Sequence, residues 1–424
     1  VRCAADDLPL AEGQFAFTLP IRHLAKDAKQ RMSERTIRGK TAVAGVGETT
    51  YYKHGQSPDN EFVLVLKAIL AACEDAGISP EEIDGFASYS NDRNEPTRIA
   101  AALGIKELKY SNMNWGGGGG GVAAAVGNAS AAVACGYADC VVAFRGLAQG
   151  QFRRFGQSAP DPHVSGDAAY MSPYGIMSPL QKYAMRAMRF MHENDADHSV
   201  LRSISMASYT HAQNNPRAVM YNRPLSEEKY DDSRWIAEPC RLFDCCQEND
   251  GAAACIIVSA EKARDLKQKP AFILGAAQGS DHRCGAPVMN ASNFPSSSFA
   301  TLAPRLYEMA QVSPGDVDVV QSYENFTIGV MMAVVEHGFC APEECNEFFQ
   351  LENLIAPSGK MPLNSSGGNL AECYMHGLGL QIEAVRQIRG GSVNQVPGAD
   401  VAINIAGPMV HHVSSIIMGS EATL

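Results

Sequence analysis

A short unit occurs twice in this chain, and the repeat restricts the possible folds more than any other feature of the sequence. Residues 79–91 and 313–325 share the pattern Ser-Pro-x-acidic-(Ile/Val)-Asp, three variable positions and then Ser-Tyr-x-Asn. Each copy follows a segment, residues 63–73 and 302–309, whose apolar side chains recur at helical spacing. Each copy then leads through a turn into a short apolar strand. We therefore expect two similar halves.

A glycine turn followed by a helix also occurs once in each half. Residues 116–121 are all glycine and precede an alanine-rich helix, while Gly367 and Gly368 precede a predicted helix over residues 378–388. Strand and helix segments alternate in both halves, and this alternation favours parallel sheets covered by helices. The pattern predicts an α/β fold.

The repeat also suggests where the halves begin and end. We expect an N-terminal half at residues 32–265, which includes a loop insertion at about 150–237, and a C-terminal half at residues 266–424. The insertion contains a Met-rich helical stretch at residues 183–192.

Residues 1–31 differ in character from the rest of the chain. They have scattered charges and no stable period, whereas Met32 lies just ahead of an apolar strand at residues 41–46. We interpret residues 1–31 as an upstream extension from a mis-assigned start. We expect them to contribute no core contacts, so that their deletion leaves the melting temperature unchanged.

Charge and composition exclude several classes of protein. The 424 residues carry a net charge of −11 and a pI of about 5.5, whereas nucleic acids and anionic membranes are bound by basic surfaces. No apolar run free of charge or glycine reaches the roughly 18 residues of a membrane span. The 12 cysteines form no C-x-x-C pair, so we expect reduced thiols in a cytoplasmic protein, with no metal site.

The loop at residues 364–377 carries a motif of a known family. Asn-Ser-Ser-Gly-Gly at residues 364–368, followed by Cys373-Tyr374-Met375, resembles the thiolase catalytic loop, which is written N-x-S-G-G, a short spacer and then G-H-P. Tyr374 holds the position of the family's histidine, which activates a cysteine in thiolases. The resemblance indicates a thiolase fold, but the loss of the histidine indicates a reaction different from that of thiolases.

A second thiolase motif, written N-E-A-F or H-D-C-F, corresponds to Tyr323-Glu324-Asn325-Phe326. Residues 210–216 and 239–253 further resemble the thiolases of the sterol-carrier-protein type. The resemblance to the thiolase superfamily covers residues 36–424. It implies a five-layered αβαβα fold built from two similar halves, with an inserted loop domain.

The nucleophile of thiolases has no counterpart here. Thiolases hold a cysteine at the first glycine turn, where a helix N-terminus lowers its pKa. That position falls at Trp115 or one residue to either side, and residues 112–116 contain no thiol. The last thiolase motif, which carries a cysteine in many members, corresponds to residues 404–408 and has none. Acyl-cysteine chemistry is therefore not expected.

The six glycines at residues 116–121 need an explanation, because each glycine in a helix costs roughly 0.5–1 kcal/mol relative to alanine. One interpretation is that their N–H groups approach a thioester carbonyl and leave room for a bulky acyl chain. The alternative is a flexible low-complexity loop or a tight helix crossing. The run opens an apolar helix, which favours the functional interpretation.

A cysteine-free glycine run combined with tyrosines at two catalytic positions resembles the thiolase-like aldolases of steroid side-chain degradation, often labelled lipid-transfer proteins. The resemblance implies retro-aldol cleavage of a bulky 3-hydroxyacyl-CoA to a ketone or aldehyde and to acetyl-CoA or propionyl-CoA. The CoA thioester is then the substrate, and no cofactor is expected. The rivals are a thiolase or acyltransferase that uses Cys373, and a noncatalytic lipid or acyl-CoA binder.

The reaction and the resemblance give roles to particular residues. Tyr323 and Tyr374 are expected to act as base and acid, with His376 as a third catalytic residue. Ionising a tyrosine at pH 7 costs about 4 kcal/mol, so a positive neighbour or strong donor is expected. His376 is the candidate nearest in sequence for this positive neighbour or donor, although a helix at this position would point its side chain away from Tyr374. We expect the following residues to bind substrate, with backbone N–H groups of either glycine turn holding the enolate and His211 lining the pantetheine channel: Trp115, Gly116, Gly117, Gly118, His211, Glu324, Asn325, Gly367 and Gly368.

Two protein partners are expected from the resemblance. Thiolases pair through the strand of the first glycine motif, here residues 108–113, which implies a homodimer. The cysteine-free aldolases commonly associate with a separately encoded protein of the DUF35 type, which has a zinc ribbon and an oligonucleotide-binding-type (OB-fold) barrel. No nucleic acid or membrane partner is expected.

Overall fold

The computed structural model describes residues 36–424 apart from residues 91, 116–117, 152–163, 167, 283–292 and 411. Apart from Thr36, this part of the chain belongs to one compact unit, Ile37–Leu424. The predictions for residues 1–31 and for Gly116 and Gly117 fall outside the described residues.

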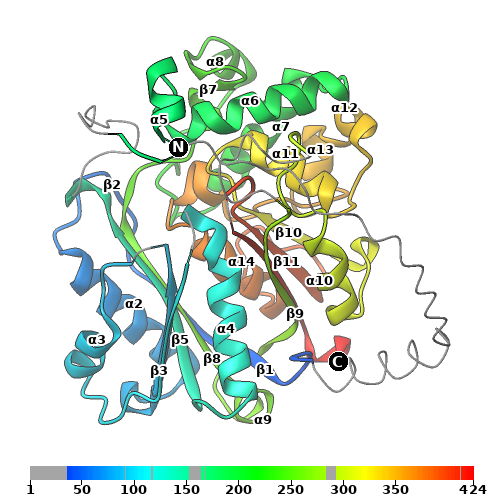
Figure 1. Ribbon diagram of the computed structural model, residues 1–424. Coiled ribbons are helices and arrows are strands. Elements are labelled where there is room, and N and C mark those ends of the chain that lie inside the picture. The colour runs from blue at the N-terminus through cyan, green and yellow to red at the C-terminus, as the bar shows by residue number, and fades with distance from the viewer. Residues whose placement is uncertain are drawn as a thin grey trace, which may run out of the picture. The chain divides into compact units, whose positions relative to one another are not determined.

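One large mixed sheet runs through both halves of the unit (Figure 1). Its strand order is β10-β11-β12-β9-β1-β8-β5-β3-β4, and β2 pairs with β8. The halves join where Ala42 and Val43 of β1 pair with Phe272 and Ala271 of β9. The strands of the sheet are β1 (Thr41–Glu48), β2 (Tyr52–Lys53), β3 (Gly85–Tyr89), β4 (Tyr110–Asn114), β5 (Cys140–Ala148), β8 (Asn249–Ser259), β9 (Ala271–Gly279), β10 (Val319–Ser322), β11 (Val401–Ala406) and β12 (Val413–Gly419).

The directions of the strands follow the expectation only in part. β3 is parallel to β4 and β5, and β10 is parallel to β11, as alternating strands and helices predict. β8 is antiparallel to β1 and β5, and β12 is antiparallel to β9 and β11. The expectation of parallel sheets is wrong for these strands. The connection between β11 and β12 is too short for a parallel pair, because parallel neighbours need a crossover of roughly a dozen residues or more.

Helices in three layers alternate with the two half-sheets and give the five layers that the thiolase resemblance implies. Figure 1 shows α2 and α3 outside the first half-sheet, α10 and α11 on the side of the second, and α4 and α14 between the two. The middle helix α4 is rich in alanine and packs against strands of both halves, among them β3, β5, β9 and β12. The helices are α2 (Glu61–Ala76), α3 (Pro96–Leu103), α4 (Val122–Ala134), α10 (Leu302–Ala310), α11 (Thr327–Glu336) and α14 (Leu378–Arg389).

The two copies of the sequence repeat occupy matching places in the two halves. In the first copy, a 3₁₀ turn at Pro80–Glu82 is capped by Ser79 and leads into β3. In the second copy, a 3₁₀ turn at Pro314–Asp316 is capped by Ser313 and leads into β10. The amphipathic helices α2 and α10 precede them, which confirms the predicted pattern of elements.

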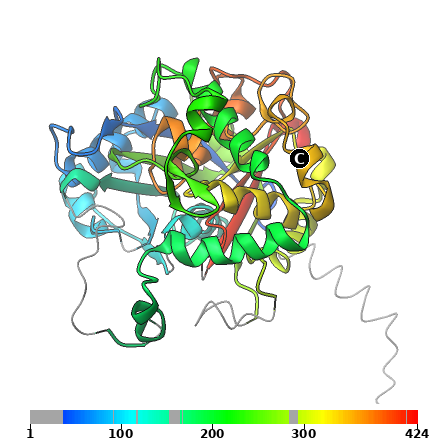
Figure 2. The same cartoon turned by 90° about the horizontal axis from the view of Figure 1, so that it is seen from above.

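The residues predicted to form the insertion contribute helices that lie over one end of the sheet, green in Figures 1 and 2. Its long helices α6 and α7 pack against α11 of the second half, and the Met-rich stretch lies in α6. No helix in the described ranges is both long and apolar enough to span a bilayer. The remaining elements are α5 (Ala168–Met171), α6 (Pro179–Glu193), α7 (His198–Gln213), α8 (Glu227–Asp231), β6 (Trp235–Ala237), β7 (Cys240–Arg241), α9 (Ala260–Arg264), α12 (Cys345–Phe348) and α13 (Leu351–Leu354).

Candidate active site

Two tyrosines meet in a buried position beside the glycine turn of the first half. Tyr323 directly follows β10, and Tyr374 follows a helical turn at Gly368–Glu372. Their hydroxyl oxygens are 2.7 Å apart, which is a hydrogen bond. Tyr323 is 1% and Tyr374 5% exposed, so the pair is shielded from bulk water. Tyr323 lies at the carboxyl end of a parallel strand, where open α/β sheets place their ligands.

The loop that carries Tyr374 is fixed to the end of β10 by Asn364. The Asn364 side chain accepts a hydrogen bond from the backbone N–H of Ser322 and donates one to the Ser322 carbonyl, each at 2.8 Å. Gly367 and Gly368 then turn the chain with φ of 106° and 56°. A side chain at Gly368 would overlap the carboxylate of Glu324. The local geometry therefore explains the asparagine and the two glycines of the Asn-x-Ser-Gly-Gly motif.

His376 stands edge-on to Tyr374, with ring centroids 5.1 Å apart and an interplanar angle of 86°. Residues 373–376 are not helical, and φ of His376 is 48°, so the expectation that a helix turns this side chain away is wrong. Burial lowers the pKa of His376 well below its usual value, and the charges of Arg145 and Arg93 lower it further. The imidazole is therefore neutral at pH 7 and does not supply the expected positive charge.

Glu324 is fully buried and lies beside the loop that carries Tyr374. Its carboxylate accepts hydrogen bonds from the backbone N–H of Asn369 at 2.8 Å and from the Asn369 side chain at 3.1 Å. Burial raises the pKa of Glu324 to about 8, although these hydrogen bonds oppose the rise. Asn325 accepts from the backbone N–H of Phe326 with its side chain and from that of Cys246 with its carbonyl. Binding of a substrate hydroxyl by Glu324 or Asn325 stays a prediction.

The described part of the glycine run, Gly118–Gly121, packs tightly against the chain's own tyrosines. A side chain at Gly119 would overlap the Tyr323 ring, and a Cβ at Gly121 would lie 2.5 Å from Cβ of Tyr89. A side chain at Gly120 would overlap the carbonyl of His412. Gly118 adopts a left-handed φ of 57°. Close packing thus accounts for three of these glycines and left-handed backbone for the fourth.

Two further candidates lie in different surroundings. Trp115 follows β4 and is 87% exposed, and its neighbour Asn114 donates to the side chain of Gln278 at 2.8 Å. His211 is buried in the last turn of α7, where its Nε2 accepts a hydrogen bond from the backbone N–H of Ala356 at 2.8 Å. Burial lowers the pKa of His211 to about 4. Its hydrogen bond is that of a packed histidine, and no described contact links it to the tyrosine pair.

Comparison with known proteins identifies the family. The model of the thiolase C-terminal domain-like family matches residues 278–420. A 17-hydroxy-3-oxo-4-pregnene-20-carboxyl-CoA lyase of Mycobacterium tuberculosis is 37% identical over 393 residues, which cover 90% of this chain and 100% of the relative. A steroid side-chain-cleaving aldolase of Thermomonospora curvata is 36% identical, with 90% and 98% covered. The chain belongs to the thiolase-like aldolase family. The solved structure of an Ltp2-ChsH2(DUF35) aldolase matches with a TM-score of 0.85 and 35% identity, over 92% of this chain and 100% of that one.

The family relationship confirms the fold and the reaction type predicted from the motifs. This aldolase is a carbon–carbon lyase with the thiolase fold. The tyrosine pair also fits the family, because retro-aldol cleavage moves protons and needs no nucleophile. Burial raises the pKa of both Tyr323 and Tyr374 well above 10.

Sequence reasoning missed two residues that lie behind the pair. Tyr89 donates a hydrogen bond to the carbonyl of His376. Burial and the neighbouring Cys246 raise the pKa of Tyr374, and the hydrogen bond with Tyr323 and the positive charge of Arg145 offset part of that rise. Both residues left a signal in the sequence. Tyr89 aligns with Tyr323 in the repeat, and Arg145 is a lone charge in the apolar run of residues 140–148.

We expect iodoacetamide to leave the activity of this aldolase largely intact. Burial raises the pKa of Cys373 well above its usual value, with the charges of Glu372 and Glu48 adding to the effect. The thiolate is the form that reacts, so Cys373 should label slowly. Among the cysteines in the described ranges, Cys135 is exposed and should label first. Peptide mapping and residual activity after labelling test this. Stoichiometric inactivation with the label on Cys373 would support a thiolase instead.

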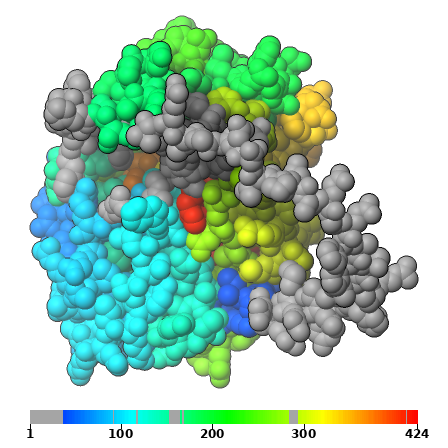
Figure 3. All heavy atoms as spheres, viewed as in Figure 1, coloured from blue at the N-terminus to red at the C-terminus, as the bar shows by residue number. Residues whose placement is uncertain are grey.

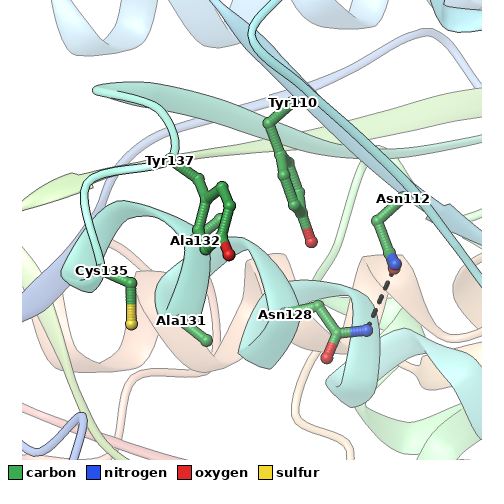
Figure 4. Close-up of a pocket in the computed structure, with 7 residues that line it drawn as sticks. All are labelled: Tyr110, Asn112, Asn128, Ala131, Ala132, Cys135 and Tyr137. Atoms are coloured by element: carbon green, nitrogen blue, oxygen red, sulfur yellow. Dashed lines mark hydrogen bonds between the residues drawn. The ribbon is translucent and has the colours of Figure 1, made fainter.

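A separate shallow pocket lies at the other end of α4. Figure 4 shows Tyr110 and Asn112 of β4 together with Cys135 and Tyr137, which line this pocket. Its volume is about 250 Å³. Asn128 of α4 donates to the Asn112 side chain at 3.1 Å. The tyrosine pair, in contrast, packs near the N-terminal end of α4. Within the residues that the structure describes, no group of three or more His, Cys, Asp or Glu side chains is arranged to hold a metal ion.

Proposed function

We propose that this aldolase cleaves a 3-hydroxyacyl-CoA whose acyl group is a steroid side chain. The bond between C2 and C3 breaks, the hydroxyl carbon becomes the carbonyl of a ketone or aldehyde, and C2 leaves within acetyl-CoA or propionyl-CoA. The observation that carries the proposal is the buried hydrogen bond of 2.7 Å between Tyr323 and Tyr374. The names of the two relatives, a steroid carboxyl-CoA lyase and a side-chain-cleaving aldolase, support the substrate class.

The tyrosine pair acts as a proton relay in this proposal. One phenol accepts the proton of the 3-hydroxyl, passes its own proton to the other phenol, and that phenol protonates C2. The relay returns the pair to its starting state, because one proton is taken up and one is released. Burial raises the pKa of both hydroxyls and keeps them protonated at pH 7. A concerted relay suits such a neutral pair, because no free tyrosinate has to form.

The thioester enolate that forms when the bond breaks needs hydrogen-bond donors. The N–H of Gly367 already donates to the carbonyl of Asn364 at 2.9 Å, and that of Gly368 to the Ser366 hydroxyl at 3.4 Å. We place the donors in the other glycine turn, Gly118–Gly121, where a backbone hydrogen bond of Gly119 already reaches Tyr323. That turn lies against the Tyr323 ring.

Product analysis tests the proposed reaction. A steroid 3-hydroxyacyl-CoA incubated with the purified protein should yield equal amounts of a ketone or aldehyde and of a shorter acyl-CoA, measured by mass spectrometry. Free CoA consumption with a 3-ketoacyl-CoA would identify a thiolase. Saturable binding of the hydroxyacyl-CoA without turnover would identify a carrier.

We further propose that the protein forms a homodimer through β4. This strand lies at one edge of the sheet and pairs in the described structure with β3 alone, so its other side carries unpaired backbone groups. Met113 is 41% exposed on this strand, and the pocket of Figure 4 lies beside it. The cyan surface in Figure 3 belongs to this part of the first half.

We also propose that full activity needs a separately encoded DUF35-type protein with a zinc ribbon and an OB-fold barrel. The solved aldolase with 35% identity is named together with ChsH2(DUF35), which supports a partner of the DUF35 type. A bound partner would exclude water from the enolate and strengthen its hydrogen bonds.

We expect size-exclusion chromatography of the chain alone to give a dimer, and co-expression with the DUF35-type protein to raise kcat at least about tenfold. Elution as an active monomer would contradict the dimer. A dimer whose cleavage rate is indifferent to the added protein would contradict the partner.

A further inference from the structure

A third buried tyrosine, Tyr89, lies behind the Tyr323–Tyr374 pair. It ends β3 in the first half and occupies the place in the sequence repeat that Tyr323 occupies in the second. Tyr89 is fully buried, and its hydroxyl donates a hydrogen bond of 3.0 Å to the carbonyl of His376. The rings of Tyr89 and His376 are 6.5 Å apart. Tyr89 thus connects the first half to the loop that carries Tyr374.

One glycine turn contacts both Tyr89 and Tyr323, the tyrosines at matching places in the sequence repeat. Gly119 lacks a side chain where the Tyr323 ring packs, and Gly121 lacks one where Cβ of Tyr89 packs. The two glycines belong to the same 3₁₀ turn, Gly118–Gly121, which continues into α4. A shift of Tyr89 would therefore displace the turn that also contacts Tyr323.

A buried ion pair fixes the backbone of Tyr89. The Arg145 guanidinium donates to the carbonyl of Tyr89 at 2.7 Å and to the carboxylate of Asp92 at 3.0 Å. The two side chains of this pair are 5% and 0% exposed. The guanidinium carbon also lies 5.5 Å from the centre of the Tyr89 ring. Arg145 thereby anchors Tyr89 through its backbone carbonyl, while the hydroxyl of Tyr89 bonds to His376.

His376 needs such support because its backbone is strained. Its φ of 48° lies in the left-handed region that non-glycine residues rarely adopt, and such a conformation persists where the surroundings hold it. The hydrogen bond from Tyr89 to its carbonyl is one of the contacts that hold it. In this conformation the imidazole stands edge-on to Tyr374, whose hydroxyl meets Tyr323.

We propose that Tyr89 is a positioning residue for the retro-aldol reaction. It holds His376 in its left-handed conformation and, through His376, sets the Tyr374 hydroxyl against that of Tyr323. The inference rests on the proposed function, in which these two hydroxyls relay the proton.

Tyr89→Phe tests the proposal against a matched control. We expect kcat to fall about tenfold, because a small displacement of a catalytic group is costly, while KM stays within about twofold. The control is Tyr307→Phe, since Tyr307 of α10 also donates to a histidine carbonyl, that of His337, at 2.9 Å. Both variants lose a phenol hydrogen bond of the same kind and should show similar melting temperatures. Only Tyr89→Phe should lose activity. Wild-type kcat for Tyr89→Phe, or an equal loss for Tyr307→Phe, would overturn the proposal.

A double variant separates positioning from a general loosening of the fold. If Tyr89 acts through Tyr374, then Tyr89→Phe should cause no further loss of kcat in a Tyr374→Phe background. A second tenfold loss in that background would show an independent role and contradict the inference. The wild-type protein provides the remaining distinction. Absence of cleavage by the wild type, both alone and with the DUF35-type protein, would refute the proposed function. Cleavage unaffected by Tyr89→Phe would refute the positioning role alone.

Discussion

Replacement of Tyr374 by phenylalanine is expected to lower kcat by at least about 10²-fold, and replacement of Tyr323 to do the same. Each change removes one hydroxyl of the pair whose oxygens are 2.7 Å apart. The ring stays, so the fold and the binding of CoA esters should persist. Steady-state kinetics with a steroid 3-hydroxyacyl-CoA measures kcat, and calorimetry with an unreactive CoA thioester measures binding.

The control for these two variants is Tyr307→Phe, which removes a phenol hydroxyl from a hydrogen bond between α10 and His337, the residue that follows α11. It should keep the wild-type kcat. If Tyr323→Phe or Tyr374→Phe cleaves substrate at nearly the wild-type rate, the residue concerned has no part in the mechanism.

Gly119→Ala should inactivate the enzyme as completely as the loss of Tyr323. The new methyl group would overlap three atoms of the Tyr323 ring, which is buried and has little space to move. The ring must shift, and a displacement of about 1 Å from productive geometry can cost about 10²-fold in rate. Overpacking should also lower the stability by about 1–3 kcal/mol. Turnover and thermal melting measure the two effects.

Gly391→Ala controls for the general effect of replacing glycine by alanine. Gly391 follows α14, and a Cβ there would meet nothing within 4 Å. This variant should match the wild type in rate and stability. A Gly119→Ala enzyme that retains a third or more of the wild-type kcat would show that the turn yields without disturbing Tyr323.

The sequence predicted the fold well because the repeat and the catalytic loops are local patterns. The capped turn before each repeat strand and the glycine-led helices α4 and α14 can be recognised from residues close in the chain. The directions of β8 and β12 could not be recognised in this way, because strand pairing depends on how distant segments come together in the sheet. The five-layer arrangement came from the family resemblance and not from periodicity.

The site was predicted in part for the same reason. The motifs aligned Tyr323 and Tyr374 with the catalytic positions of thiolases, but the hydrogen bond between them spans 51 residues and follows only from the folded structure. The strained backbone of His376 and the contact of Tyr89 with its carbonyl depend on packing between the halves. The pKa of Glu324, which burial raises to about 8, likewise depends on the surroundings that folding creates.

The glycine turn has a consequence for anyone who engineers this enzyme toward wider or narrower acyl groups. The tyrosine pair belongs to the C-terminal copy of an internal duplication, while the turn that seats Tyr323 belongs to the N-terminal copy. A mutagenesis library directed at Gly119 to Gly121 would therefore remove catalysis before it changed selectivity. The two halves cannot vary independently where Gly119 contacts Tyr323, because a larger residue at position 119 requires a smaller one at position 323. The smaller residue would have no phenol.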